Sequence, residues 1–384
     1  MPGLYLVAAE PSGDLLASEI VEVIRKKAPD TDIHGIGGEH LASVGIISPI
    51  DTSELSVVGL LEGVKIYKRV IELADQAAED IIKAAPDVVG LVDSWGYTLR
   101  VAQRVRERAP HIRLVKVVGP QVWATRPGRA KTLAQTVDHL VCIHAFEEPF
   151  YEPFGLPTTV MGNPALSRGH KGDRKAGRAL LGVSETDPLL LVLPGSRRGE
   201  IAQVAPVLMD AARRLKDSLP EAQIVVHPSA NVRAQFLEAF PDVEQWALLS
   251  PTSADRFDIM SAADFALACS GTVTSELALQ ETPFLVGYHM GWVTWALARF
   301  FLFKPKHITL LNIAADDTEI VPEFVQTRFK AGPIADTALA MLTDSKARSA
   351  QIDAQKKALS RMGESQLDSA QIAAQTLLDC AQPR

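Results

Sequence analysis

The stretch LLLVLPGSRRGEI at residues 189–201 indicates the fold of the second half of the chain. It joins a continuous apolar run, typical of a buried parallel strand, to a turn of Pro and Gly and then to a helical pattern. The first half repeats this arrangement in LYLVAAEPSGD at residues 4–14, where an apolar run again leads into a helix-opening turn. Together the two stretches predict an α/β fold with two parallel sheets, each covered by helices.

Similar apolar runs recur along nearly the whole chain, separated by helical patterns. The predicted strands form two series, Leu4–Ala9, Val88–Val92, Leu114–Val118 and His139–Ile143, then Leu189–Leu193, Gln223–His227, Asp264–Ala268 and Phe284–Gly287. The predicted helices include Leu15–Ala28, Tyr97–Ala109, Ile201–Ser218 and Thr272–Leu279. The polar, glycine-rich stretch around residues 165–180 is the expected linker, and the chain from Ile334 onward is expected to be helical without strands.

Length and composition also favour two globular domains. The chain has 384 residues, more than twice a typical domain of roughly 150 residues. It is 47% hydrophobic and 22% charged, which excludes a disordered chain. Its net charge of −7 argues against bulk binding to nucleic acid. The three cysteines show no CxxC spacing, so neither a disulfide framework nor a zinc site is predicted.

The apolar stretches indicate neither a secretion signal nor a membrane-spanning segment. Residues 4–9 follow no basic segment, and the uncharged stretch through Pro283–Ala298 is shorter than the roughly 20 residues that cross a bilayer. Leu55–Ile71 and Trp292–Lys306 combine apolar or aromatic side chains with basic ones, which suits a membrane surface. The alternative for each is a core helix. The chain is expected to be cytoplasmic, either soluble or bound to a membrane surface.

The candidate catalytic residues follow predicted strands, where α/β folds bind their ligands. After the first strand, Ser12 is expected as a helix N-cap with Asp14 in the first turn. This cap does not explain Glu10, so a ligand-facing role for that carboxylate stays open. Asp93 ends the strand Val88–Val92 beside Trp95, which suits a general base because an apolar neighbour raises a carboxyl pKa. The alternative is that Asp93 caps the next helix.

A turn-rich loop follows Leu114–Val118 and holds Trp123, Arg126 and Arg129. Most such loops are plain surface. An aromatic side chain with basic neighbours nevertheless suits a phosphorylated sugar, so this loop is a candidate binding loop.

Two glycine-containing turns of the second half are candidate phosphate sites. In the first, the amides after Gly195 are expected to point at an anion, with Ser196 and with Arg197 as a bidentate charge. The second turn is Ser270-Gly271-Thr272, with Glu276 one helical turn further as a partner for ribose hydroxyls. Each alone is compatible with a simple N-cap. Two of them after strands of one domain favour a nucleotide diphosphate.

Several common sites are missing from the sequence. There is no G-x-G-x-x-G after the first strand and no P-loop motif anywhere. The one D-x-D, Asp30-Thr31-Asp32, is expected in a surface turn, and the nine histidines show no paired metal-ligand spacing. No metal and no cofactor are therefore predicted.

These motifs, in this order, resemble the lipid-A-disaccharide synthase family of glycosyltransferases. The matching stretches are AAEPSGD (8–14), ELSVVGLLEG (54–63), PDVVGLVDS (86–94), QVWATRPGR (121–129), LPGSRRGEI (193–201), CSGTVTSELAL (269–279), VGYHM (286–290) and LLNI…VPEFVQ (310–326). The resemblance covers residues 4 to 345. It implies a GT-B fold with two facing Rossmann-like domains, an acceptor and membrane-facing one at 1–168 and a UDP-sugar donor one at 169–345. Helices at 346–384 would cross back to the first domain.

The resemblance also implies roles for individual residues. Asp93 matches the family's general base, and the remaining matches lie around the donor. These are Gly195, Ser196, Arg197, Ser270, Gly271 and Thr272 near the UDP phosphates, Glu276 toward the ribose, and Asn312 and Gln326 near the donor. The implied reaction is an inverting transfer from UDP-2,3-diacylglucosamine to 2,3-diacylglucosamine 1-phosphate (lipid X) in lipid A biosynthesis. It is expected at the cytoplasmic face of the inner membrane, without metal, and a homodimer is left open.

The chain departs from the family pattern mainly in the acceptor half. The usual D-[AS]-P-D-F-N reads Asp93-Ser94-Trp95-Gly96-Tyr97-Thr98 here, and S-P-S-V-W-A-W reads GPQVWAT at 119–125. The usual G-H-P is Gly162-Asn163-Pro164. Two other functions remain open from the sequence. One is an isomerase like UDP-N-acetylglucosamine 2-epimerase, which shares the fold and the G-N-P turn, and the other is a sugar-nucleotide-binding protein without catalysis. The membrane-facing segments speak against the soluble isomerase.

Overall fold

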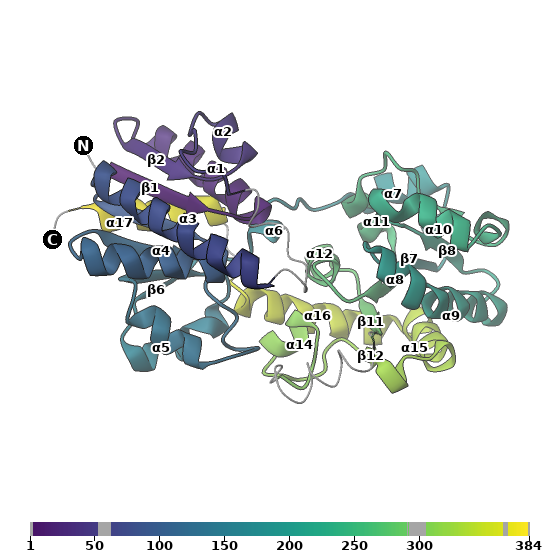
Figure 1. Ribbon diagram of the computed structural model, residues 1–384. Helices are drawn as coiled ribbons and strands as arrows, with labels where there is room; N and C mark the ends of the chain where they lie inside the picture. Colours follow the sequence, from purple (N-terminus) through teal and green to yellow (C-terminus); the bar gives the residue numbers. More distant parts are fainter. Residues whose placement is uncertain (1–2, 53–62, 290, 292–304, 364–367, 383–384) are drawn as a thin grey trace. The chain divides into compact units, whose positions relative to one another are not determined.

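The computed structural model describes residues 3–52, 63–289, 291, 305–363 and 368–382 of the chain. The chain divides into two compact units. The first unit comprises Met1–Ser167 and Met362–Arg384, and the second comprises Arg168–Arg361. Each unit is built on one six-stranded sheet with helices around it (Figure 1).

The sheet of the first unit is parallel, with strand order β2-β1-β3-β4-β5-β6. Its strands are β1 (Gly3–Ala8), β2 (Asp32–Ile36), β3 (Val88–Val92), β4 (Arg113–Val117), β5 (His139–Cys142) and β6 (Thr158–Val160). β1, β3 and β4 are neighbours, so the carboxyl ends of these three strands lie side by side. This edge of the sheet is where the fold places a ligand.

Helices cover both faces of this sheet. They are α1 (Pro11–Lys27), α2 (Glu39–Ser43), α3 (Gly63–Ala84), α4 (Trp95–Arg108), α5 (Gly128–Ala134), η2 (Ala145–Phe150), η3 (Glu152–Phe154), α6 (Pro164–Ser167) and α17 (Ser369–Ala381). Tyr5 and Val7 of β1 face a core with α3 and α4, whereas the alternate residues Leu4 and Leu6 face α1 and α17. The C-terminal helix α17, yellow in Figure 1, thus packs against α1.

The second unit repeats this plan with strand order β12-β11-β10-β7-β8-β9. Its strands are β7 (Leu189–Leu193), β8 (Gln223–Val226), β9 (Leu248–Leu249), β10 (Phe265–Cys269), β11 (Phe284–Tyr288) and β12 (Glu323–Val325). Because β7 and β10 are neighbours, the two turns that follow them lie at the same edge of the sheet. These are the two turns predicted to bind phosphate.

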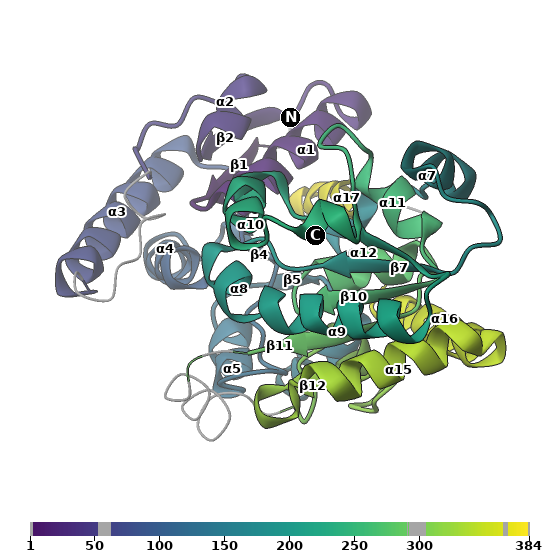
Figure 2. The same cartoon turned by 90° about the vertical axis from the view of Figure 1, so that its right-hand side faces the viewer.

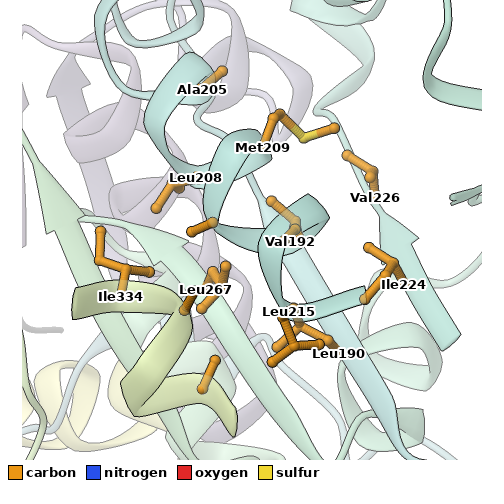
Figure 3. Close-up of a cluster of buried hydrophobic side chains, with 14 of the residues drawn as sticks. Leu190, Val192, Ala205, Leu208, Met209, Leu215, Ile224, Val226, Leu267 and Ile334 are labelled. Carbon is orange, nitrogen blue, oxygen red and sulfur yellow. The ribbon is translucent and has the colours of Figure 1, made fainter. Parts of the chain in front are cut away.

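The helices of the second unit complete its core. They are α7 (Arg174–Leu181), α8 (Arg198–Gln203), α9 (Ala205–Ser218), η4 (Ala230–Val232), α10 (Arg233–Ala239), η5 (Val243–Gln245), α11 (Arg256–Ala262), α12 (Val273–Leu279), α14 (Leu310–Ala314), η7 (Gln326–Arg328), α15 (Ala331–Thr343) and α16 (Ser345–Arg361). α9 and α15 pack side by side (Figure 2). Figure 3 shows Leu208 of α9 and Ile334 of α15 with Leu267 of β10 in this buried cluster.

The eight predicted strands are confirmed, each with both ends within one residue of the prediction. The four unpredicted strands, β2, β6, β9 and β12, are the edges of the two sheets. Edge strands are short and half-exposed, so they lack the continuous apolar run of a strand buried on both faces. Asp32, expected in a surface turn, is the first residue of β2. The single helix expected over Ile201–Ser218 is divided into α8 and α9, because Pro206 cannot continue a helix and lies in the first turn of α9.

The unit boundary falls between Ser167 and Arg168, inside the expected linker region. The helices at 346–384, which were expected to cross back to the first domain together, divide between the two units. α16 packs against α12, α14 and α15 of the second unit, whereas α17 packs against α1, β3 and β4 of the first. α16 therefore belongs to the second unit, and the return to the first begins at Met362.

The segments expected to face a membrane lie largely outside the described residues. Leu55–Leu61 and Trp292–Lys304 are not described, and α3 begins at Gly63. Lys306, at the end of the second segment, is exposed. Among the helices that the structure describes, none has the length and apolar composition needed to cross a bilayer.

Candidate functional site

Ser12 and Asp93 meet at the carboxyl edge of the first sheet. The Ser12 hydroxyl donates a hydrogen bond to Asp93 Oδ2 at 3.2 Å. Gly13 permits this approach of α1, because a Cβ at that position would lie 3.2 Å from the Asp93 Cβ. Glu10 precedes α1 and is exposed. The structure thus brings together Ser12 and Asp93, two of the three predicted catalytic residues.

The predicted cap at the start of α1 is wrong. Pro11 begins the helix and Glu10 occupies the N-cap position without a side-chain hydrogen bond, because proline at the first position already fixes the helical backbone. Asp14 instead accepts hydrogen bonds from the amides of Gly38 and His40, both at 2.8 Å, and of Leu41 at 3.3 Å. The buried Asp14 carboxylate therefore caps α2.

Asp93 does not cap the helix that follows it. Ser94 occupies the N-cap position of α4, and Asp93 and Ser94 both have left-handed backbones with φ of +50° and +43°. Such conformations cost non-glycine residues free energy and cluster at functional sites. Within the part of the chain that the structure describes, the Asp93 carboxylate accepts a hydrogen bond only from Ser12. It is therefore available to a ligand.

Lys116 of β4 lies beneath this strained turn and was not singled out by sequence reasoning. Its side chain is 1% exposed, and its ammonium donates to the Asp93 carbonyl and to Thr98 Oγ1. Burial lowers the pKa of Lys116 to about 7, against the opposing effect of the Asp93 and Glu10 carboxylates. The signal in the sequence was a lysine within the apolar run RLVKV (113–117).

The buried Lys116 makes a pH-dependent contribution to stability that Lys116→Met should remove. The pKa is about 7 when folded and about 10.4 in an unfolded chain. The unfolded state therefore binds more protons between these values, so the stability of the wild type rises with pH across this window. Urea unfolding should show that, between pH 6.5 and 9.5, the free energy of unfolding of the wild type increases by about 1 kcal/mol or more relative to that of Lys116→Met. The exposed Lys131→Met is the control, and equal pH responses of wild type and Lys116→Met would contradict the expectation.

Asp93 opens into a pocket of about 290 Å³ in the first unit. The loop after β4 forms one wall. The lining residues are Asp93, Trp95, Val118, Gly119, Pro120, Gln121, Trp123, Thr125, Arg129, Ile143, His144 and Glu147. Val118 has φ of +66°, a strained value for a β-branched residue. The pocket thus combines the predicted base, Asp93, with two residues of the predicted binding loop, Trp123 and Arg129.

His144 and Glu147 line the same pocket, and sequence reasoning missed both. The Glu147 carboxylate accepts a hydrogen bond from the His144 amide at 2.9 Å, while His144 Nδ1 lies 3.1 Å from the Met362 carbonyl. Burial raises the pKa of Glu147 to about 7 and lowers that of His144 to about 4. At neutral pH His144 is uncharged and Glu147 is partly protonated.

The turn after β7 does not present its amides to solvent, contrary to the prediction. The amides of Ser196 and Arg197 donate to Glu200 Oε2 at 2.8 and 3.1 Å. Gly195 is required here, because a Cβ would lie 2.6 Å from the Glu200 Cβ. The Arg197 side chain is 78% exposed and Nη1 lies 3.1 Å from Glu200 Oε1. A carboxylate of this chain thus occupies the position expected for a bound anion.

The turn after β10 has the arrangement predicted for an anion site. Among the described residues, the amides of Gly271 and Thr272 have no hydrogen-bond acceptor. Glu276 Oε1 accepts from Arg256 Nη2 at 2.9 Å. Both turns line a pocket of about 240 Å³ in the second unit, together with His227 and Arg256. Six predicted donor residues therefore meet here: Gly195, Ser196, Ser270, Gly271, Thr272 and Glu276.

Asn312 and Gln326 lie elsewhere in the second unit. Asn312 is fully buried, and its amide donates to the Val321 carbonyl and to Glu323 Oε1 and accepts from the Ile320 and Val321 amides. These hydrogen bonds join α14 to β12 and to the two residues Ile320 and Val321 that precede it. Gln326 begins η7, is buried and has φ of +52°. Neither lines the 240 Å³ pocket.

The described ranges hold no group of three or more His, Cys, Asp or Glu side chains arranged to bind a metal ion. The positive charge near the two pockets comes instead from side chains of this chain. Arg129 lines the first pocket and Arg256 lines the second, while Arg197 pairs with Glu200, which also lines the second.

Comparison with known proteins gives the family. A match to the family described as lipid-A-disaccharide synthetase spans residues 4–377. The chain belongs to the lipid-A-disaccharide synthase family. It is 32% identical to the lipid-A-disaccharide synthase of Rhodospirillum centenum and 34% identical to that of Ruegeria pomeroyi, each over 98% of this chain and 94% of the relative. Its function is lipid-A-disaccharide synthase activity in lipid A biosynthesis, so it is a glycosyltransferase.

Solved structures with the same architecture confirm the fold class. The chain is similar to a putative UDP-N-acetylglucosamine 2-epimerase from Listeria monocytogenes, with TM-score 0.60 over 98% of this chain and 94% of that one at 14% identity. It is also similar to Acinetobacter baumannii MurG, with TM-score 0.58 over 99% and 100% of the two chains at 12% identity. At such identities the likeness shows the GT-B-like fold alone. The full-length family match, by contrast, sets aside the isomerase and the non-catalytic sugar-nucleotide-binding protein.

Proposed function

We propose that the first unit binds the acceptor and that Asp93 is the general base of the transfer. Asp93 would take the proton of the acceptor 6-hydroxyl as that oxygen attacks the anomeric carbon of UDP-2,3-diacylglucosamine. The C–O bond to the phosphate breaks, UDP leaves with the bonding electrons, and the configuration at the anomeric carbon inverts. The observation that carries this proposal is the Asp93 carboxylate, which opens into the 290 Å³ pocket with Ser12 as its partner.

Two neighbours of Asp93 would assist as positioning residues. Ser12 fixes the orientation of the carboxylate through Oδ2, which leaves Oδ1 for the substrate hydroxyl. Lys116 holds the Asp93 carbonyl and Thr98, and so supports the left-handed turn that presents the carboxylate.

The second unit would bind the UDP part of the donor. Since Glu200 occupies the amides of Ser196 and Arg197, the diphosphate is assigned to the amides of Gly271 and Thr272 and to the guanidinium groups of Arg197 and Arg256. Glu276 would accept the ribose hydroxyls in exchange for Arg256. Two guanidinium groups and two amides stabilise the charge that develops on the leaving group, so the proposed route needs no metal.

An assay with both substrates tests this proposal. UDP-2,3-diacylglucosamine and lipid X should give equimolar UDP and disaccharide, with the same rate in EDTA. UDP release should require the acceptor, which distinguishes transfer from isomerisation of the donor alone. Glu276→Gln should weaken UDP binding by roughly tenfold or more while leaving the acceptor KM unchanged. Activity that is lost in EDTA and restored by magnesium would contradict the metal-independent route.

We also propose that the protein works on the cytoplasmic face of the inner membrane. Both substrates are acylated, and each buried methylene contributes about 0.8 kcal/mol to membrane partitioning. The sequence of Leu55–Ile71 and Trp292–Lys306 supports attachment there, because apolar and aromatic residues alternate with lysines and arginines. The attachment is peripheral, and acidic lipids would meet the basic residues although the whole chain carries a charge of −7.

Vesicle flotation should therefore show binding to anionic vesicles that weakens at high salt. Each basic residue near such a surface contributes roughly 1 kcal/mol, and salt screens this attraction. Changing Val58, Leu60 and Leu61 together to Ser should weaken binding further, because their apolar area is lost. Neutral phosphatidylcholine vesicles are the control for the charge effect. Recovery of the wild type entirely in the lipid-free fraction at low salt would contradict the proposal.

A further inference from the structure

The pocket that contains Asp93 also contains an arginine placed over an aromatic ring. The guanidinium carbon of Arg129 lies 5.2 Å from the centroid of the Trp95 ring, and both residues line the pocket. A guanidinium over an indole face gains a cation–π interaction that limits its freedom. The planar guanidinium presents several N–H donors, which suits a ligand that accepts two parallel hydrogen bonds.

Arg126, three residues earlier in the same loop, adds a second positive charge near Arg129, although it does not itself line the pocket. Arg126 has a left-handed backbone with φ of +47°. Burial, and after it the charge of Arg126, lowers the pKa of Arg129. Two like charges this close repel each other, and the backbone at Arg126 is strained as well. The chain thus maintains an unfavourable arrangement at this position, which calls for a compensating ligand.

Neither arginine has a carboxylate partner within the described part of the chain. Other arginines of the first unit do have one. Arg104 pairs with Asp75, Arg106 pairs with Asp138 at 2.6 Å, and Arg108 pairs with Glu79 at 3.9 Å. Arg129, with Arg126 next to it, thus brings positive charge to the pocket of Asp93 that no carboxylate of the described residues neutralises. An anion with at least two oxygens, such as a phosphate, would neutralise both.

We propose that Arg126 and Arg129 form the subsite for the anomeric phosphate of the acceptor. This inference rests on the proposed function, in which Asp93 of the same pocket receives the acceptor 6-hydroxyl. The phosphate is attached to C1, and the 6-hydroxyl is carried by C5 through C6, so both groups stand on the two carbons that flank the ring oxygen and one pocket must hold both. A volume of about 290 Å³ is at the small end of ligand clefts, which suits a sugar phosphate whose acyl chains remain outside.

The subsite would select the acceptor by its charge. A sugar that lacks the phosphate would leave Arg126 and Arg129 facing each other without compensation, so the pocket should discriminate strongly against it. The donor sugar carries its phosphates as a nucleotide ester and so presents a bulkier group at its anomeric carbon. The arginine pair thus gives a physical reason for the two acylated sugars to bind in different pockets.

A cycle of enzyme and substrate variants tests this proposal. The acceptors are 2,3-diacylglucosamine 1-phosphate and the same lipid without its phosphate, and the enzymes are the wild type and Arg129→Ala. For the phosphorylated acceptor, Arg129→Ala should raise KM roughly 10- to 100-fold, because a hydrogen bond to a charged group is lost. For the lipid without phosphate the same change should have almost no effect. Arg126→Ala should behave in the same way, and Arg108→Ala, outside the pocket, should leave both acceptors unaffected.

A binding measurement provides a readout that does not need turnover. Glucosamine 1-phosphate has no acyl chains, and its binding next to Trp95 should change the tryptophan fluorescence of the full chain. Glucosamine should not, and Trp95→Phe should remove the signal. The phosphate subsite is overturned if Arg129→Ala raises the KM of both acceptors equally and binds glucosamine 1-phosphate as tightly as the wild type does. Failure of the general-base assignment would show separately, as normal turnover of an Asp93 variant.

Discussion

Asp93→Asn is expected to lower kcat by about 10²–10⁴-fold while leaving UDP affinity nearly unchanged. The substitution keeps the shape of the side chain and its hydrogen bond with Ser12, but an amide cannot accept the proton of the acceptor hydroxyl. In the proposed function UDP is assigned to the second unit, so its affinity should have no direct dependence on Asp93. Single-turnover rates, together with calorimetric titration of UDP, separate the two effects.

Ser12→Ala is the matched control for this prediction. It removes the hydrogen bond to Asp93 Oδ2 and leaves the carboxylate, so its rate should fall by much less than that of Asp93→Asn. If Asp93→Asn keeps a near-normal rate, Asp93 is not the base. Glu10 would then be the next candidate, because its exposed carboxylate follows the neighbouring strand β1.

The interior of each sheet could be predicted from the sequence, and its edges could not. A strand buried on both faces must be apolar at every position, as Leu189–Leu193 is, and this pattern is visible without a structure. β9 is two residues long and half-exposed, and β6 has no fully buried residue, so neither strand shows this continuous apolar pattern. The division at Met362 was also not predicted, because α16 and α17 both read as helices and nothing in either sequence shows which sheet it packs against.

The candidate site could be predicted where chemistry depends on a single residue after a strand. Asp93 is such a residue, and the structure adds a partner, Ser12, which the sequence had suggested only as a helix cap. The prediction failed where a side chain of the chain itself can bind the same backbone amides as a ligand. Nothing in LPGSRRGEI shows that Glu200 turns back onto the amides of Ser196 and Arg197, since a ligand would satisfy them equally well. Lys116 was missed because its role depends on the neighbouring strand, β3.

Arg178→Met is expected to destabilise the second unit by about 3–5 kcal/mol. Arg178 lies on α7 and is 1% exposed, although this part of the chain was expected to be a linker. Its guanidinium donates to Asp264 Oδ2 at 2.8 Å and to the carbonyls of Ala262, Ser184 and Asp187. Methionine fills similar space but leaves three carbonyls and a carboxylate without this donor in the interior, and each such loss is costly.

Thermal unfolding with and without UDP identifies the transition of the second unit, because a ligand that binds only the folded unit raises its melting temperature. That transition should move to much lower temperature in Arg178→Met.

Arg174→Met is the matched control. Arg174 pairs with the other oxygen of Asp264 at 2.7 Å but is 40% exposed, so in this variant water can replace much of the lost interaction with the carboxylate. If Arg178→Met is as stable as Arg174→Met, the buried ion pair of α7 contributes little to the stability of the second unit. A large loss would show instead that the second unit, to which we assign the donor, depends for its stability on a helix that lies in the expected linker region.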